Sequence, residues 1–386
     1  MPDTTGRSAP TGNEALRRIR TDAVLAALRE HGPVSRTGLA DLTGYRPSSL
    51  TEIVRDLMGS GHVLQVGTGD SSGGRRPRLL AFNPAAETLV VVSLEGDQAR
   101  AAVVDLAGEP YGEHTRRIDA ADPFTGLVAL IGEAVAGSTG PVPGRVVFSV
   151  PGVATVEGAV TLSPVLRALG DDSLTSTLAD RVGLPVRTEN DVNLVALGER
   201  EQGAAADVDD LVLIYVGYGV GAALVTGGAL CRGAAGFAGE IGFLPAGPPP
   251  EPHEGGRGRF EQRWSVPGIA AALAGPDGPA PADPVGELAR RAGEPEVATL
   301  RRSVIEAWAY AAIVCSCVVN PARVVYAGAA VRLGEPGLAE LRALVAASAP
   351  SAPEVMFAEL GARALHVGAV SPAVSSSAVV ATRPTP

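Results

Sequence analysis

Two adjacent polar residues, Asn190 and Asp191, have the chemistry to recognise a ligand that is rich in hydroxyl groups. An amide and a carboxylate together offer the donors and acceptors that vicinal hydroxyls require. Residues 186–191 predict a strand, and functional residues of α/β folds gather where strands end. A helix is predicted to follow over residues 192–201, so an alternative is that the pair only caps that helix. The two roles are compatible.

A second candidate site lies on a helix that is predicted to begin near residue 46. Its apolar face repeats at helical spacing and consists of Leu50, Ile53, Val54 and Leu57. Its polar face consists of Ser48, Ser49, Thr51, Glu52 and Arg55. Short hydroxyl side chains and one cation on an exposed face could reach base edges or phosphates of DNA.

The elements around this helix predict a winged helix-turn-helix. Ser35 can cap a preceding helix that turns Leu39 and Leu42 inward, and Gly44 ends that helix. Pro47 suits the first turn of the second helix. Two strands, over residues 62–66 and 78–82, flank a Gly/Ser loop whose tip carries Arg75 and Arg76, which is typical of a DNA-contacting wing. The alternative is a small helical subdomain with a hairpin and no nucleic-acid role.

The distribution of charge favours the DNA-binding interpretation. Residues 1–84 hold 11 Arg and 8 Asp or Glu, a net charge of +3. The remaining residues therefore hold 21 of the 32 basic and 34 of the 42 acidic residues, a net charge of −13. Only the N-terminal part could approach a polyphosphate without repulsion.

Composition sets limits on the remaining possibilities. A length of 386 residues suggests two or three domains, and every basic residue is Arg, which excludes Schiff-base and P-loop lysine chemistry. The sequence has no apolar signal region, so we expect a cytoplasmic protein that does not associate with a membrane. The three Cys form no CxxC pair, and Cys315 and Cys317 are predicted to pack in a core.

The predicted elements indicate four segments. Residues 1–14 and 376–386 are expected to be disordered tails, and the polar stretch after about Ser371 leads into the second of them. Residues 15–84, with a first helix over 22–30, form the winged helix-turn-helix. Residues 85–375 contain strand pairs that alternate with helices twice over, which predicts an α/β body of two lobes with a cleft between them.

Three stretches of sequence resemble the ROK family of repressors, open reading frames and sugar kinases, in its repressor branch. They are GGRRP at Gly73–Pro77, the ENDxN stretch at Glu189–Asn193 and RGAAGFAGEIG at Arg232–Gly242. The resemblance covers residues 20–375 and implies a winged helix-turn-helix joined to a two-lobed, actin-like (ribonuclease H-like) sugar kinase fold. It also implies binding to double-stranded operator DNA as a homodimer or homotetramer, under the control of a sugar or sugar phosphate.

The resemblance assigns roles to several residues. Asp191 matches the base that deprotonates the sugar hydroxyl in the kinases. Glu240 and Glu261 match two further carboxylates that contact the sugar. Repressors of this type read bases with the helix that begins near Arg46, and the wing pair Arg75 and Arg76 matches arginines that enter an A·T-rich minor groove.

Two departures from the family pattern argue against phosphoryl transfer. The first phosphate loop of the kinases, D-x-G-x-T, is replaced by Ser93-Leu94-Glu95-Gly96-Asp97, which loses an Asp and gains two acidic residues that repel ATP. In the second phosphate loop, Tyr218 replaces a small hydroxyl residue. We therefore expect a protein that is not an enzyme, has no catalytic residues and needs no cofactor.

The zinc site that the resemblance would imply is also absent from the sequence. The family places a His after Glu-Ile-Gly and three Cys in a short run, whereas this chain has Phe243 and no Cys over residues 250–260. His253 alone cannot complete a tetrahedral site, so we expect no bound metal.

Three functions remain in order of preference. The first is a transcriptional regulator, a repressor of carbohydrate-related genes that responds to a sugar in the cleft. The second is a regulator whose cleft is vestigial and ignores sugars. The third is a sugar kinase, against which the altered phosphate loops and the extra DNA-binding arm both argue.

Overall fold

A computed structural model describes residues 12–69, 76–119, 121–154, 160–161, 174–245, 257–275 and 278–376. Contacts divide the chain into two compact units. The first runs to Thr88 and includes Gly140–Val142, and the second begins at Leu89 and contains the rest.

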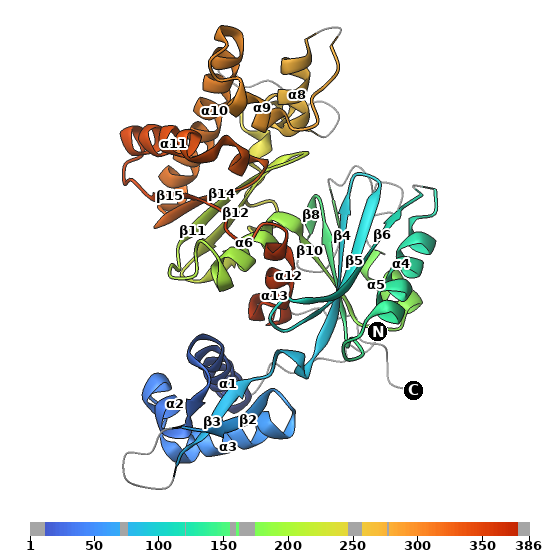
Figure 1. Ribbon diagram of the computed structural model, residues 1–386, viewed down its shortest axis with the longest axis vertical. Coiled ribbons are helices and arrows are strands. Elements are labelled where there is room, and N and C mark those ends of the chain that lie inside the picture. Colours follow the sequence, from blue (N-terminus) through green and yellow to red (C-terminus); the bar gives the residue numbers. More distant parts are fainter. Residues whose placement is uncertain are drawn as a thin grey trace, which may run out of the picture. The chain divides into compact units, whose positions relative to one another are not determined.

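The first unit is a winged helix-turn-helix (Figure 1). Its elements are α1 (Gly12–His31), β1 (Val34–Ser35), α2 (Arg36–Thr43), α3 (Pro47–Gly59), β2 (Val63–Thr68), β3 (Arg78–Phe82) and the short η1 (Pro84–Ala86). The strands form a sheet in the order β1-β3-β2. The Oγ of Ser35 accepts a hydrogen bond from the backbone N of Gly38, and Gly44 ends α2 in the left-handed region, at φ 67°. The cap, the turn and the proline start of α3 are thereby confirmed.

The core of this unit agrees with the predicted apolar face of α3. Leu50, Ile53, Val54 and Leu57 are buried against α1 and the small sheet. Leu39 is buried as predicted, but the prediction for Leu42 was wrong, because 46% of it is exposed. α2 has eight residues and presents only one side to the core.

The first helix is longer than predicted. α1 begins at Gly12, ten residues before Asp22, so residues 12–14 are helical rather than part of a disordered tail. Residues 1–11 lie outside the described residues. Within the added turns, Arg17 donates a hydrogen bond to Asp56 of α3.

The second unit contains two sheets. The first has the strand order β10-β7-β4-β5-β6 and the second the order β13-β12-β11-β14-β15. The first sheet is built from β4 (Thr88–Glu95), β5 (Gln98–Asp105), β6 (Pro110–Arg117), β7 (Val146–Val150) and β10 (Val186–Asn190). The second is built from β11 (Leu211–Val216), β12 (Val220–Thr226), β13 (Ala229–Cys231), β14 (Arg323–Gly328) and β15 (Glu354–Phe357). A separate pair is β8 (Val153–Ala154) with β9 (Val160–Thr161).

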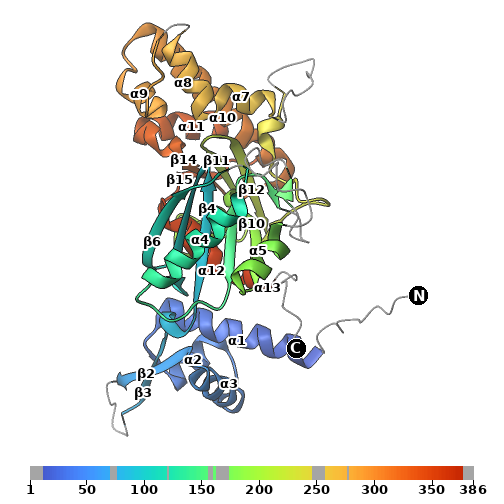
Figure 2. The same cartoon turned by 90° about the vertical axis from the view of Figure 1, so that its right-hand side faces the viewer.

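Helices cover both faces of each sheet (Figures 1 and 2). On the first sheet, α4 (Pro123–Gly137) and α5 (Leu174–Val182) pack on one face. Two helices, α6 (Asp191–Gln202) and α12 (Arg363–Val370), pack on its other face and also on the second sheet. The far side of the second sheet carries α10 (Pro295–Val319) and α11 (Gly334–Ser348). The remaining elements are η3 (Ile241–Phe243), α7 (Arg259–Trp264), α8 (Val266–Ala274), α9 (Pro284–Arg290), η4 (Ala329–Leu333) and α13 (Pro372–Ser376).

Several boundaries differ from the predicted ones. β6 was not predicted, because its residues alternate between exposed and half-buried positions and include Pro110 and Gly112. α10 begins at Pro295, eight residues before the predicted start. The polar stretch after Ser371 forms α13, and Val374 is only 1% exposed. Disorder directly after Ser371 was therefore a wrong prediction, and residues 377–386 lie outside the described residues.

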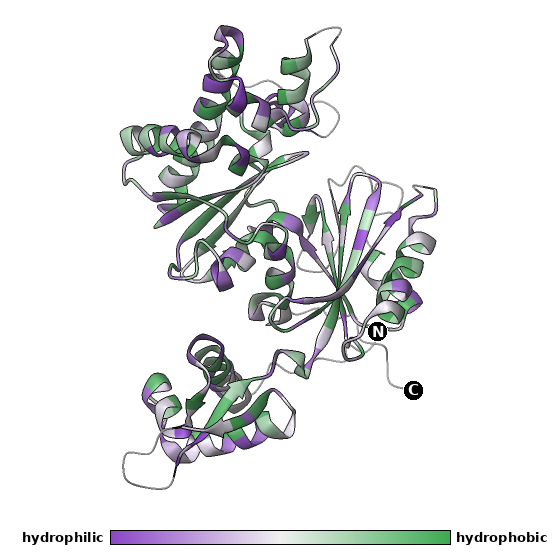
Figure 3. Ribbon diagram, in the orientation of Figure 1, coloured by the Kyte–Doolittle hydropathy of each residue, from purple (hydrophilic) through white to green (hydrophobic). Residues whose placement is uncertain are grey.

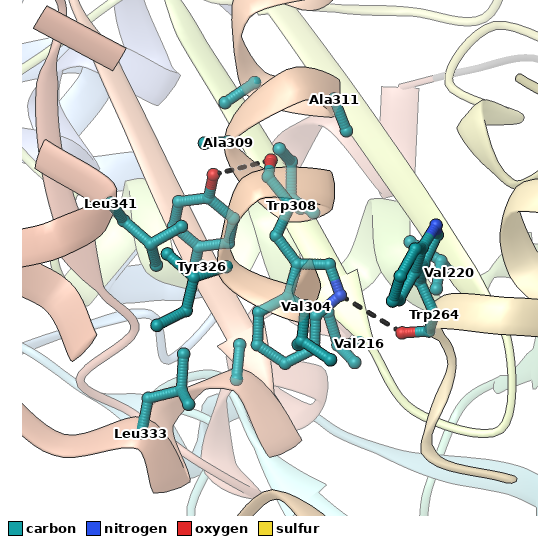
Figure 4. Packing of buried hydrophobic residues seen from close by; sticks show 14 of the residues in the cluster. Val216, Val220, Trp264, Val304, Trp308, Ala309, Ala311, Tyr326, Leu333 and Leu341 are labelled. Carbon is teal, nitrogen blue, oxygen red and sulfur yellow. Dashed lines mark hydrogen bonds between the residues drawn. The ribbon is translucent and has the colours of Figure 1, made fainter. Parts of the chain in front are cut away.

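The core around the second sheet centres on two large aromatic residues (Figure 4). Trp308 and Tyr326 are fully buried. The indole N–H of Trp308 donates to the carbonyl of Trp264 at 3.1 Å, and the hydroxyl of Tyr326 donates to the carbonyl of Trp308 at 2.9 Å. Both polar groups are thus satisfied inside an apolar core, which their burial requires. Figure 3 shows the same apolar character along the inner strands.

α10 supplies much of this core. By length and hydropathy this helix could cross a membrane, but half of its most apolar window is buried inside the protein. Its residues Val304, Ile305 and Trp308 pack on the second sheet, which identifies it as a core helix. Cys315 is buried as predicted, whereas the prediction for Cys317 was wrong, because it lies on the exposed side of α10.

We predict that Trp308→Ala lowers the free energy of unfolding by about 3–5 kcal/mol, because it removes a fully buried indole and leaves a cavity. Urea denaturation followed by circular dichroism would measure this change. Arg302→Ala, on the exposed side of the same helix, is the control and should change stability little. Equal effects of the two substitutions would contradict the assignment of Trp308 to the core.

Candidate functional site

A group of acidic side chains comes together from separate elements of the second unit. Asp191 is the first residue of α6, Glu240 directly precedes η3 and Glu261 lies in α7. Glu95, at the end of β4, and Tyr215, in β11, face Asp191 closely enough to perturb its titration or their own. The structure thus brings together three of the predicted ligand residues, Asp191, Glu240 and Glu261.

Asp191 is a half-buried carboxylate at a helix N-terminus. Its Oδ1 accepts a hydrogen bond from the backbone N of Val192 at 2.8 Å. The pKa of Asp191 is raised to about 6, chiefly by burial and to a smaller extent by the negative charge of Glu95, while the backbone hydrogen bonds act in the opposite direction. Such a carboxyl can change its protonation state near neutral pH.

Glu240 is more strongly perturbed. Burial raises the pKa of Glu240 to about 7, and the charges of Glu261 and Asp191 add to the effect. Burial also raises the pKa of Tyr215 to about 12, with Asp191 and Glu95 contributing. The site therefore holds carboxylates under mutual repulsion beside a neutral phenol, and both kinds of group can hydrogen-bond to hydroxyls.

Asn190 lies next to this group, but its side chain is already engaged. Its Oδ1 accepts from the backbone N of Asn193 at 2.9 Å, which makes Asn190 the N-cap of α6. Its Nδ2 donates to the carbonyl of Gly152 at 2.7 Å. The capping alternative for Asn190 is therefore confirmed, and its amide is committed to holding α6 and the residue before β8 in place.

The residue before Asn190 plays a part that the sequence did not reveal. Glu189 is 2% exposed, and its carboxylate accepts from Asn193 Nδ2 at 3.0 Å and from Arg232 Nη2 at 2.5 Å. A buried carboxylate with a guanidinium partner and an amide donor is fully compensated. Within the ENDxN stretch, the side chains of Glu189, Asn190 and Asn193 therefore fix the local structure.

The two turns that correspond to phosphate loops are both occupied by side chains of the protein. At the β4–β5 turn, Asp97 accepts from Arg117 Nε at 2.5 Å, and Glu95 is exposed. At the β11–β12 turn, Arg257 donates to the carbonyl of Tyr218 at 2.8 Å. Each turn therefore makes at least one contact with an arginine side chain of the protein itself.

The predicted DNA-contacting residues lie on α3 and the wing. Arg46, Ser48, Thr51 and Arg55 are exposed, and Ser49 is half-buried. The hydroxyl of Thr51 donates to the carbonyl of Pro47 at 2.7 Å, so only its acceptor side faces outward. Arg55 is within 3.4 Å of Asp56. Arg76 is exposed, and Arg75 lies outside the described residues.

No group of three or more metal-ligating side chains occurs in the part of the chain that the structure describes. His253 and the stretch over residues 246–256 lie outside it. At the position where the family carries a His, Phe243 ends η3 and offers no donor atom to a metal.

Known structures with the same fold include both a regulator and kinases. The chain matches a ROK family transcriptional regulator described as a homologue of the Escherichia coli MLC protein, with a TM-score of 0.78 and 21% identity over 94% of this chain and 96% of that one. It also matches a ROK family glucokinase from Streptomyces griseus, with a TM-score of 0.61 and 25% identity over 73% and 98% of the two chains. The fold is therefore α/β, with an N-terminal winged helix-turn-helix and an actin-like body.

The ROK family pattern matches residues 90–373, and the chain belongs to the ROK family. It is 30% identical over 239 residues to the xylose repressor of Caldicellulosiruptor bescii. It is 26% identical over 252 residues to the transcriptional dual regulator NagC of Escherichia coli K12. These matches cover 60% and 64% of this chain, and 60% and 62% of the relatives' lengths.

We predict that Glu240→Gln stabilises the protein at pH 8 and has little effect near pH 4.5. The folded-state pKa of about 7 lies above the ordinary value of 4.5, so the contribution of Glu240 to stability is lost as the pH rises through 7. Gln removes that loss, which is worth about 1–3 kcal/mol. Thermal denaturation at both pH values would measure it, with Glu306→Gln, an exposed site, as the control.

Proposed function

We propose that this protein is a DNA-binding transcriptional repressor of carbohydrate-related genes, whose affinity for its operator changes when a sugar binds beside Asp191, Glu240 and Glu261. Residues 15–84 bind DNA, and residues 85–375 sense the ligand and form the homodimer or homotetramer. The observation that carries the proposal is the combination of an exposed polar face on α3 with an acidic site in an actin-like body.

The names of the relatives support the proposal of a transcriptional repressor. A xylose repressor and NagC match the chain over 239 and 252 residues. A winged helix-turn-helix places its second helix in the major groove, which is the position of α3 with Arg46, Ser48, Ser49, Thr51 and Arg55. A protein with this role acts on DNA in the cytoplasm.

The charge of the site favours a neutral sugar over a sugar phosphate. Glu95 acts on Asp191, and both Glu261 and Asp191 act on Glu240, so a phosphate bound here would add to the repulsion. Hydroxyl groups, in contrast, donate hydrogen bonds to carboxylates and relieve part of that repulsion.

Phosphoryl transfer is disfavoured for a related reason. The two turns that face the site are occupied by Asp97, Glu95 and Arg257, as described above, and a nucleotide would have to displace them. We therefore propose that Asp191 binds a sugar hydroxyl without passing it to a phosphoryl group, and that the protein is not an enzyme.

A second candidate is a regulator that ignores sugars. Asn190 is committed to the cap of α6, and Phe243 stands where the family has a His, so two side chains that could contact a sugar do not. The deciding experiment is fluorescence anisotropy of labelled DNA from the region upstream of the protein's own gene, with and without D-xylose, D-glucose and N-acetylglucosamine. Specific binding that no sugar shifts would favour this second candidate over the first.

We predict that Arg75→Ala with Arg76→Ala weakens binding to all DNA sequences and flattens the dependence of affinity on salt. Each lost phosphate contact reduces the slope of log K against log salt by about 1. The control is Arg291→Ala with Arg302→Ala, two exposed arginines of the second unit. An unchanged DNA affinity in the wing variant would disprove the assignment of the wing.

We predict that Asp191→Ala keeps DNA binding and loses any response to sugar, because its carboxylate is half-buried and is directed at the proposed ligand rather than at DNA. Asn190→Ala is the matched comparison: it removes the cap of α6 and should cost about 1 kcal/mol of stability. Thermal denaturation and anisotropy on both variants would separate the two roles. Unfolding of Asp191→Ala would instead assign Asp191 to the cap.

A further inference from the structure

One arginine connects the acidic site to the β11–β12 turn. Arg257 precedes α7, and its Nε donates to Glu261 Oε1 at 2.7 Å. Its Nη2 donates to the carbonyl of Tyr218 at 2.8 Å, and its guanidinium lies 5.0 Å from the centre of the Tyr218 ring. The planar guanidinium thus joins a carboxylate, a backbone carbonyl and an aromatic face at once, which a Lys side chain could not do with the same geometry.

Glu261 is held from both sides as a result. Its second oxygen, Oε2, accepts from the backbone N of Val220 at 3.3 Å. The space around it is narrow, because a Cβ on Gly219 would lie 2.7 Å from Oε2. Glu261 is therefore fixed between α7 and the turn, and 20% of its side chain is exposed.

Glu240 is placed differently. Within the described residues no cation or hydrogen-bond donor reaches its carboxylate, and the charged groups that face it are Glu261 from α7 and Asp191 from α6. Asp191 in turn faces Glu95 from β4 and Tyr215 from β11. The Arg257–Glu261 pair packs against the segment that carries Glu240, because a Cβ on Gly242 would lie 3.2 Å from Glu261 Oε2.

We propose that Arg257 is the positioning residue of this site: held on Tyr218, it orients Glu261 and sets the charge state of Glu240 through it. The positive charge of Arg257 acts on Glu240 indirectly, because it cancels part of the negative charge of Glu261. The residue needs a positive charge for this effect, and it needs the fork of a guanidinium for the orientation.

This inference deepens the proposed function and rests on it for its meaning, since Glu240 and Glu261 are the proposed sugar contacts. An ionised Glu240 accepts hydrogen bonds from hydroxyls, whereas a protonated one must also find an acceptor for its own proton. Arg257 would thereby keep Glu240 a good acceptor at a lower pH than the carboxylates alone would allow.

The test needs no sugar, so its failure can be distinguished from failure of the proposed function. The carboxyl carbon of Glu240 is followed by NMR against pH in the full-length protein labelled with [δ-13C]glutamate, and Glu240→Gln assigns the signal. The wild type should titrate near 7. Arg257→Gln, which keeps hydrogen-bond donors without the charge, should raise the midpoint by about 0.5–1 pKa unit.

Two further variants make the result decisive. Arg257→Lys restores the charge and should bring the midpoint back to within a few tenths of the wild-type value, whereas Arg263→Ala, an exposed arginine of α7 that stacks on Trp264, should leave it unchanged. A Glu240 midpoint that does not move in Arg257→Gln would overturn the proposal. So would an equal shift in the Lys and Gln variants, which would assign Arg257 a role in packing alone.

Discussion

The close crossing of α6 and α12 is the contact on which the second unit depends. A Cβ on Gly198 would lie 2.0 Å from the carbonyl oxygen of Ala364, and one on Gly368 would lie 1.8 Å from that of Leu194. Glycine at both positions therefore lets the two backbones touch. Because the pair packs on both sheets, this crossing sets the separation of the sheets and the place of Asp191 at the start of α6.

The acidic site follows from that geometry. With α6 fixed, Asp191 lies where the end of β4 brings Glu95 and where β11 brings Tyr215, while η3 and α7 add Glu240 and Glu261. Burial, with a contribution from neighbouring negative charge, raises the pKa of Asp191 and of Glu240, and the protein compensates the carboxylates of the site unequally. Asp191 accepts a hydrogen bond from a backbone N–H, and Glu261 accepts from Arg257 and from a backbone N–H. Within the described residues, the Glu240 carboxylate accepts from neither kind of donor. Hydroxyl donors of a ligand would supply what Glu240 lacks.

Local sequence patterns predicted the elements well where packing and pattern agree. The apolar spacing of α3, the Ser35 cap and the Gly44 turn were all visible, because each depends on neighbouring residues only. The full length of α1 was not visible, since Arg17 in its added turns contacts a residue 39 positions away. The exposure of Leu42 was not visible either, because it depends on which face of α2 the core occupies. Arg232 and Arg257 were missed as well, because their partners, Glu189 and Tyr218, are distant in sequence.

The connection between the two units restricts how a ligand could act on DNA binding. The boundary falls between Thr88 and Leu89, and Thr88 is the first residue of β4. The same strand ends at Glu95, which acts on the titration of Asp191. A ligand alters DNA affinity only if it binds two states of the protein with different free energies. In the proposed function, β4 is the strand whose displacement would have to distinguish those states, because it lies between β7 and β5 in its sheet and leads from the boundary to Glu95.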